Sequence, residues 1–255
     1  MIFKEWAKTK SSKGAAMVET LLNRVQAEVR AGNTRPGIQL TTKMYTIAVD
    51  AWAKSKEGGK AARRAEAILH HMNEMHTKFG TNDDLKPTTG IFNAVVNSWA
   101  QSKDPIASER CEQILEWMDR LCKSGNLDVK PDQYTYNTVM HAYAQSGEEN
   151  SAAKAQTILE NMDRLYKDGL SNAKPETISY NIVINAWAKS GQKGAAQEAE
   201  QLLAKMHHMY ERGDTQVKPN VVTYGAVVST GAIVNNNIRH NCLDSSLFAL
   251  LASID

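Results

Sequence analysis

Residues 174–190 read KPETISYNIVINAWAKS, and two earlier stretches follow the same plan, KPDQYTYNTVMHAYAQS at 130–146 and KPTTGIFNAVVNSWAQS at 86–102. A fourth Lys-Pro pair stands at 218–219, and successive prolines are 44 residues apart. An asparagine, a large aromatic residue and a glycine recur with the same period. Because these positions are independent of one another, their shared period indicates a chain built from repeats.

Each repeat predicts two helices. Apolar residues of the segment 92–99 recur at the i, i+3, i+4 and i+7 positions of one helical face, and the segment 111–122 carries a comparable face. Gly147 and Gly191 mark the turn between the helices, and Asp104-Pro105 takes that place in an earlier repeat. Lys-Pro then blocks further helix, and no two-residue alternation favours a strand. The sequence predicts an all-α fold, a right-handed α-solenoid of stacked helix-turn-helix repeats.

The repeat boundaries follow from the Lys-Pro pairs. Complete repeats are expected at 38–87, 88–131, 132–175 and 176–219, with a partial repeat at 1–37 and a partial repeat with a divergent tail at 220–255. We expect the recurring aromatic residues to be buried, namely Trp52, Trp99, Tyr143 and Trp187. Met1 falls inside a repeat, which suggests a truncated or misannotated start. In the tail, 245–254 fits either a capping helix or a wrongly predicted exon end.

The composition narrows the class of protein. Lys and Arg together number 30 and Asp and Glu 28, so the net charge of +2 does not by itself indicate a nucleic-acid binder. Three cysteines without a CxxC motif argue against a disulfide framework and favour a reducing compartment. The longest apolar stretch, 247–252, is too short to cross a bilayer. The start has neither a secretory signal core nor a transit-peptide composition.

The sequence contains no recognisable catalytic site. It has no Gly-rich phosphate loop, and the adjacent pairs His70-His71 and His207-His208 lack the spacing of metal ligands. Cys111 and Cys122 lie on an apolar helix face and are interpreted as packing residues. We therefore expect no enzyme activity, no metal and no cofactor.

A second row of residues, mostly polar, runs along the first helix of each repeat, off its apolar face. Its members are spaced i, i+4 and i+8: Thr46, Asp50 and Lys54; Asn93, Asn97 and Gln101; Asn137, His141 and Gln145; Asn181, Asn185 and Lys189. One interpretation is local hydrogen bonding at helix starts together with ordinary solvation. The other is a ladder of hydrogen-bonding groups, one per repeat, which suits reading single-stranded RNA base by base.

The motifs resemble those of the pentatricopeptide-repeat family. The matching pieces are TYNTVM at 135–140 and SYNIVI at 179–184 in first helices, ILENM at 158–162 in a second helix, and VKPD at 129–132 closing a repeat. The resemblance extends over about residues 1–228. The repeat here is longer than the family's usual unit, and the extra residues fall between the helices and at 121–129. The resemblance implies an α-solenoid that binds single-stranded RNA in a mitochondrion or plastid.

The resemblance also implies which residues contact RNA. One base-reading residue follows the aromatic residue that opens each first helix: Thr46, Asn93, Asn137 and Asn181. Its partner follows the closing proline: Thr88, Asp132, Glu176 and Asn220. Bases would be sandwiched by Tyr134, Ile178 and Val222, with Lys43 and Gly90 at the same place in earlier repeats, although Gly90 offers no surface for stacking. Phosphates would be met by Lys8, Lys54 and Lys189.

Two of these pairs imply a base. Asn93 with Asp132 resembles a uridine-reading pair, and Asn181 with Asn220 a pyrimidine-reading pair. We expect the asparagines to lie on one concave surface, facing their partners. The function expected is therefore RNA binding in organellar RNA processing, stability or translation. The alternatives are a protein-binding α-solenoid scaffold, favoured by the near-neutral charge and long repeats, or the recognition arm of a truncated RNA-processing enzyme.

Overall fold

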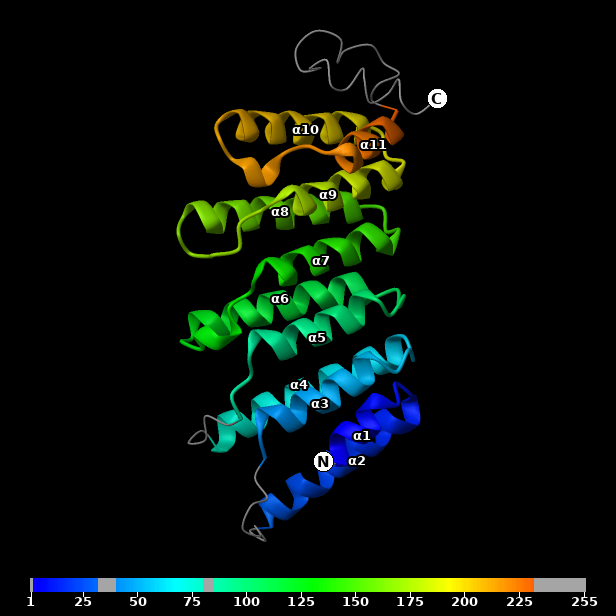
Figure 1. Cartoon of the computed structure of the whole chain (residues 1–255), viewed down its shortest axis with the longest axis vertical. Coiled ribbons are helices and arrows are strands. Elements are labelled where there is room, and N and C mark those ends of the chain that lie inside the picture. The colour runs from blue at the N-terminus through cyan, green and yellow to red at the C-terminus, as the bar shows by residue number, and fades with distance from the viewer. Residues whose placement is uncertain (1, 32–39, 80–84, 232–255) are drawn as a thin grey trace. The chain divides into compact units, whose positions relative to one another are not determined.

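The computed structural model describes residues 2–31, 40–79 and 85–231 (Figure 1). These ranges contain eleven α-helices and two short 3-10 helices, and no strand. The all-α class and the helix-turn-helix repeat are therefore confirmed. The segment 245–254, for which a capping helix was considered, lies outside the described residues. None of the described helices is both long enough and apolar enough to span a membrane.

The chain divides into two compact units, residues 1–142 and 143–255. In the first unit, first and second helices alternate along the chain: α1 (Ile2–Lys8), α2 (Ser12–Arg30), α3 (Thr42–Ala53), α4 (Gly59–Phe79), α5 (Thr89–Ala100) and α6 (Ala107–Lys123), followed by η2 (Leu127–Val129). The first helices pack side by side, α3 against both α1 and α5. Helix α3 also packs against α2 and α4, so each hairpin buries its apolar face against its neighbours.

The second unit repeats this arrangement. Its elements are α8 (Ser151–Lys167), α9 (Thr177–Ser190), α10 (Ala195–Glu211), η3 (Thr215–Val217) and α11 (Val221–Ser229). Helix α9 packs against α8, α10 and the next first helix, α11. Helix α7 (Gln133–Ser146) begins in the first unit and ends in the second.

The recurring aromatic residues form the core, as expected. Trp52 is 4% exposed, Trp99 1% and Trp187 8%, and Tyr143 is fully buried. Trp6 occupies the same position of α1 but is 40% exposed. The prediction of a buried aromatic column is confirmed for the four residues it named.

The extra residues of the long repeat fold back onto the helix that opens the same repeat. They form the 3-10 turns η2 and η3. The Thr89 hydroxyl donates to the Lys130 carbonyl oxygen at 2.8 Å, and the Thr177 hydroxyl donates to the Lys218 carbonyl oxygen at 2.9 Å. Two ion pairs also hold these loops in place: Lys86–Asp128 at 2.6 Å and Lys174–Asp214 at 2.7 Å. The lengthened loop is thus an ordered part of the repeats 88–131 and 176–219.

The turns between the two helices differ from the sequence expectation in one respect. Gly147 and Gly191 adopt positive φ angles of 69° and 61°, as their place at a helix end favours. In the earlier repeat, however, the residue with positive φ is Lys103, at 57°, and α6 begins only after Asp104-Pro105. A lysine therefore takes the place that glycine holds in the later turns.

Candidate functional site

The candidate base-reading residues lie at two recurring places. Asn93 and Asn181 lie in the second turn of the first helices α5 and α9, five residues into each helix. Asp132 and Asn220 stand directly before the next first helices, α7 and α11. Members of each pair are 39 residues apart in sequence.

In the first unit, Asn93 and Asp132 meet directly. The Asn93 Nδ2 donates to both carboxylate oxygens of Asp132 at 3.2 Å. The Asn93 Oδ1 accepts a 2.6 Å hydrogen bond from the Thr135 hydroxyl, which fixes the orientation of the amide. Thr135 is fully buried, whereas Asp132 is exposed.

Thr135 also joins Asp132 in a capping box at the start of α7. The Thr135 backbone N–H donates to the Asp132 Oδ1 at 2.8 Å, and the Asp132 backbone N–H donates to the Thr135 hydroxyl oxygen at 3.1 Å. The Asp132 carboxylate is therefore held by the helix start and by Asn93 together. Its remaining acceptor capacity faces solvent.

The second unit builds the same network with an amide in place of the carboxylate. The Asn181 Nδ2 donates to the Asn220 Oδ1 at 3.4 Å, and the Thr223 hydroxyl donates to the Asn181 Oδ1 at 2.7 Å. Asn220 caps α11 by accepting from the Thr223 N–H at 3.1 Å. Asn181 is 8% exposed and Asn220 is exposed. In both units, then, the asparagine is the less exposed member of the pair and its partner is exposed.

The other two sequence-predicted pairs are placed differently. The Thr46 hydroxyl donates to the Thr42 carbonyl oxygen of its own helix at 2.9 Å, and Thr88 makes no side-chain capping bond. Ile91 stands where Thr135 and Thr223 stand in the later repeats, so the hydroxyl that organises the network is missing. Asn137 lies in the first unit and Glu176 in the second.

Exposed apolar side chains flank the two networks. Tyr134 is 51% exposed, Ile178 62% and Val222 56%, and all three lie in the first turn of a first helix. Lys43 and Gly90 are exposed at the same place of α3 and α5. This place therefore carries an exposed apolar side chain in the three later repeats and not in the two earlier ones.

The three sequence-predicted phosphate lysines are exposed at the ends of first helices. Lys8 pairs with Glu5 at 2.8 Å, and Lys54 pairs with Asp50 at 3.2 Å. The hydrogen bond and charge of Lys8 lower the pKa of the Glu5 carboxyl. Lys189 is exposed near the end of α9.

The sequence analysis did not identify the side chains that accept hydrogen bonds from the buried tryptophans. In three repeats an indole N–H donates to a side chain on a neighbouring second helix: Trp52 to Glu19 at 2.8 Å, Trp99 to Glu66 at 2.8 Å, and Trp187 to Gln156 at 2.6 Å. Their separations of 33, 33 and 31 residues cross a repeat boundary. The available signal was an acid or amide at a fixed place of the second helix.

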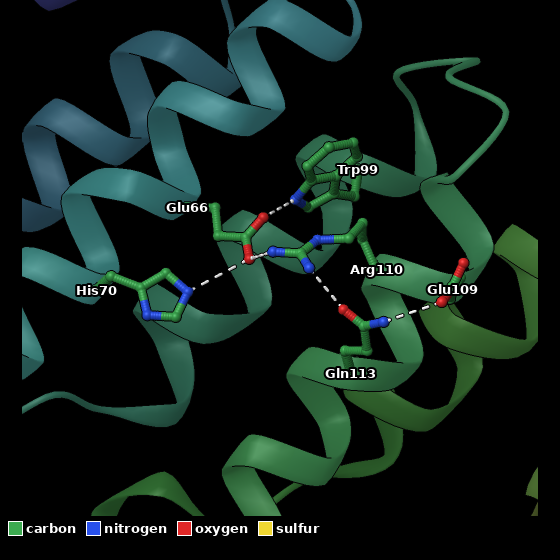
Figure 2. Close-up of polar contacts among 6 residues, drawn as sticks. All are labelled: Glu66, His70, Trp99, Glu109, Arg110 and Gln113. Atoms are coloured by element: carbon green, nitrogen blue, oxygen red, sulfur yellow. Dashed lines mark hydrogen bonds and ion pairs between the residues drawn. The ribbon is translucent and has the colours of Figure 1, made fainter.

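Glu66 is the most connected of these acceptors, as Figure 2 shows. It accepts from Trp99 and Arg110, and its other neighbour, His70, lies 3.4 Å away. Burial alone would raise the pKa of the Glu66 carboxyl, but the hydrogen bonds from His70 and Arg110 offset that effect and hold the pKa below its usual value. The carboxylate thus stays charged and ties α4 to α5 and α6.

We expect Glu66→Gln to lower the free energy of unfolding by about 1 kcal/mol at pH 7, because hydrogen bonds to a charged acceptor are stronger than those to a neutral one. A carboxyl whose pKa is lowered on folding stabilises above its unfolded pKa, about 4.3, and loses that effect as pH falls through the folded value. Urea unfolding followed by circular dichroism should therefore show that the difference in unfolding free energy between the unaltered chain and Glu66→Gln disappears below about pH 4. Glu109→Gln is the control, because Glu109 is exposed and contacts Gln113 and not Glu66. A difference in unfolding free energy for Glu66→Gln that persists at low pH would contradict this account.

The described residues offer no metal site. No three His, Cys, Asp or Glu side chains among them come together in a way that could hold an ion. Cys111 is fully buried, and burial raises the pKa of its thiol to about 12, so it serves packing. His71 contacts the Gln26 amide at 3.2 Å, and His207 contacts the Tyr224 hydroxyl at 3.1 Å.

The family model of the pentatricopeptide repeat domain matches residues 121–190, from the end of α6 through α9. The match covers 70 of the 255 residues of the chain. On the N-terminal side of the matched segment the 44-residue period carries the same Lys-Pro, asparagine and large aromatic residues. On its C-terminal side the Lys-Pro pair recurs at 218–219, but Gly225 and Gly231 stand in place of the asparagine and the large aromatic residue.

Solved structures similar to this chain include two crystal structures of the pentatricopeptide repeat protein PPR10 in complex with an 18-nucleotide psaJ RNA element, one of them a variant with three cysteine-to-serine substitutions. Both are 20% identical to this chain, with a TM-score of 0.42, and the match covers 92% of this chain. The chain spans about one third of the length of these solved chains, since the match covers 32% of each. No curated protein sequence matches the chain.

Proposed function

We propose that the chain binds single-stranded RNA and contacts one base per repeat. The observation that carries this proposal is the pairing of Asn93 with Asp132, repeated by Asn181 with Asn220. Residues 39 positions apart form the same hydrogen-bonded network twice, each time with one outward-facing polar group. A network that recurs once per repeat suits a polymeric ligand whose subunits also recur at regular spacing, such as single-stranded RNA.

The chemistry of each network fits the edge of a base. Asp132 presents carboxylate oxygens, which only accept hydrogen bonds, whereas the Asn220 amide both accepts and donates. Asn93 and Asn181 hold these groups in place, so little entropy is lost when a base arrives. By family analogy the Asn93–Asp132 pair reads uridine and the Asn181–Asn220 pair reads a pyrimidine.

The exposed apolar residues support the same proposal. Tyr134, Ile178 and Val222 each lie in the first turn of a first helix, next to a residue that belongs to the networks or aligns with them. They offer surfaces against which the face of a base can pack, and packing together with contacts to the base edge is taken to contribute about 1–3 kcal/mol per base, the range for bases stacked on aromatic side chains such as Tyr134. Three occupied repeats would give about 3–9 kcal/mol before the cost of ordering the strand. A micromolar complex needs about 8 kcal/mol net.

The biological setting proposed is a mitochondrion or plastid, in RNA processing, stability or translation, by analogy with the family. The chain would act there by binding, without a catalytic step of its own. A protein-binding scaffold is the second candidate, favoured by the balanced charge of 30 basic and 28 acidic residues. The recognition arm of a longer RNA-processing enzyme is the third.

We expect weak binding of short pyrimidine-containing RNA, at micromolar strength or weaker, with an affinity that falls as salt rises. Fluorescence anisotropy with uridine-rich and adenosine-rich 12-mers at two salt concentrations measures both properties. Selection from randomised single-stranded RNA then gives the preferred sequence. Equal affinity for all sequences would argue against base reading, and no RNA binding at all would favour the protein scaffold.

A further inference from the structure

Three turn lysines, Lys10, Lys56 and Lys103, have a backbone conformation that lysine rarely adopts. Their φ angles are 49°, 60° and 57°, and among the described residues they are the only ones other than glycine with positive φ. All three stand just after a first helix of the first unit. The left-handed conformation costs a residue with a Cβ atom about 1–2 kcal/mol.

The second unit shows that the turn does not need a lysine. Gly147 and Gly191 occupy the same place after α7 and α9, with φ angles of 69° and 61°. Glycine adopts this conformation without the steric cost. The lysines of the first unit therefore keep a strained backbone that the same fold avoids elsewhere, and such strain tends to persist where a side chain has a function.

Local contacts do not account for the turn lysines. All three side chains are exposed, and none forms an ion pair with a residue in the described ranges. This distinguishes them from Lys8 and Lys54, whose charges are paired with acids on their own helices. A cation near a helix C-terminus also interacts favourably with the helix dipole, which is why the urea midpoint is measured alongside RNA affinity below.

The turns lie next to places where a ligand can be held. Lys10 lines a pocket of about 540 Å³ between α1 and α3, together with Lys8 and Lys54. Asp50 also lines this pocket, but it is paired with Lys54. Lys8 is likewise paired with Glu5, so the Lys10 ammonium is the uncompensated charge at this pocket, and it favours an anion.

The next two turns are in contact with each other. A Cβ atom at Gly58, two residues after Lys56, would lie 3.1 Å from the Ser102 carbonyl oxygen, one residue before Lys103. Asp104 is the acid adjacent to Lys103, and Arg63 already neutralises it at 2.6 Å. Glu57 is the acid adjacent to Lys56, and the exposed Lys60 lies three residues beyond it. These turns therefore carry excess positive charge.

We propose that Lys10, Lys56 and Lys103 bind phosphates of the single-stranded RNA, so that the first unit holds the RNA backbone electrostatically. This inference rests on the proposed function and adds a set of contacts outside the base-reading pairs. The same position is glycine in both turns of the second unit, although the turn after α9 also carries the exposed Lys193. The first unit should thus supply most of the salt-dependent part of the affinity, and both units should contribute to base preference.

The test replaces all three turn lysines by glycine, the residue that the second unit uses. We expect the RNA affinity at low salt to fall at least tenfold. The slope of log affinity against log salt should shrink by about 2, since each phosphate contact to a single strand contributes about 0.7. The preference for uridine-rich over adenosine-rich RNA should stay the same. The urea midpoint should be unchanged or higher, because glycine relieves the strained turns.

Two further variants make the result decisive. Lys13→Ala, Lys78→Ala and Lys123→Ala together remove the same charge from exposed positions of second helices, and should leave the salt slope nearly unchanged. Lys→Arg at the three turns should retain the affinity. An equal loss in the second-helix variant, or a lower urea midpoint in the glycine variant, would overturn the inference. Failure of the unaltered chain to bind RNA would instead contradict the proposed function itself.

Discussion

Replacing Trp99 by alanine is expected to lower the free energy of unfolding of the first unit by about 3–5 kcal/mol. The side chain is 1% exposed, so its removal leaves a cavity in the core. Its indole N–H also donates to Glu66 at 2.8 Å, and the carboxylate, itself 5% exposed, would lose one of its partners. Urea unfolding followed by circular dichroism at 222 nm measures the change without depending on tryptophan fluorescence.

Trp6→Ala provides the matched control. Trp6 occupies the same position of its repeat but is 40% exposed, so its truncation should cost less than about 1 kcal/mol. The loss in unfolding free energy for Trp99→Phe should lie between those of Trp6→Ala and Trp99→Ala, because phenylalanine keeps most of the apolar volume and loses the hydrogen bond. Equal losses at Trp6 and Trp99 would show that burial in the repeat interface does not determine stability.

The fold was predictable because it repeats. A period seen in several independent positions gives the hairpin, its turn and its core residues at once, and the buried aromatic residues were named correctly from that pattern. The acceptors of the indole N–H groups were not predicted from the sequence, because Glu66 and Trp99 are 33 residues apart and belong to different repeats. No local rule connects such residues before the packing of neighbouring repeats is known.

The candidate site was predictable in part. The asparagines and the residues after the closing prolines were named from the sequence, and the structure brings Asn93 to Asp132 and Asn181 to Asn220. Thr135 was missed, although a threonine three residues after Asp132 fits the capping-box pattern. The strained turns could not be predicted, because a lysine in the sequence carries no sign of its φ angle.

The largest effect on base preference is expected from Asp132→Asn. The substitution should be nearly neutral for the fold, because Asn220 fills the same place in the second unit, where it caps α11 and accepts from Asn181. It changes the outward-facing group from one that only accepts to one that also donates. The N3–H of uracil needs an acceptor, whereas N3 of cytosine needs a donor. The uridine preference of this repeat should therefore relax towards either pyrimidine.

The expected size is a five- to tenfold drop in the ratio of uridine to cytidine affinity, equivalent to about 1–1.4 kcal/mol for one hydrogen bond. Anisotropy with the selected RNA and its single U-to-C variants measures this ratio at each position. Asn220→Asp should have the opposite effect and shift the base preference of the Asn181–Asn220 pair from either pyrimidine towards uridine. Asn97→Ala, one turn beyond Asn93 on α5, is the control and should leave the ratio unchanged. If Asp132→Asn weakens every RNA equally, the Asp132 carboxylate supports binding without reading a base, and the ladder of paired side chains would serve the fold alone.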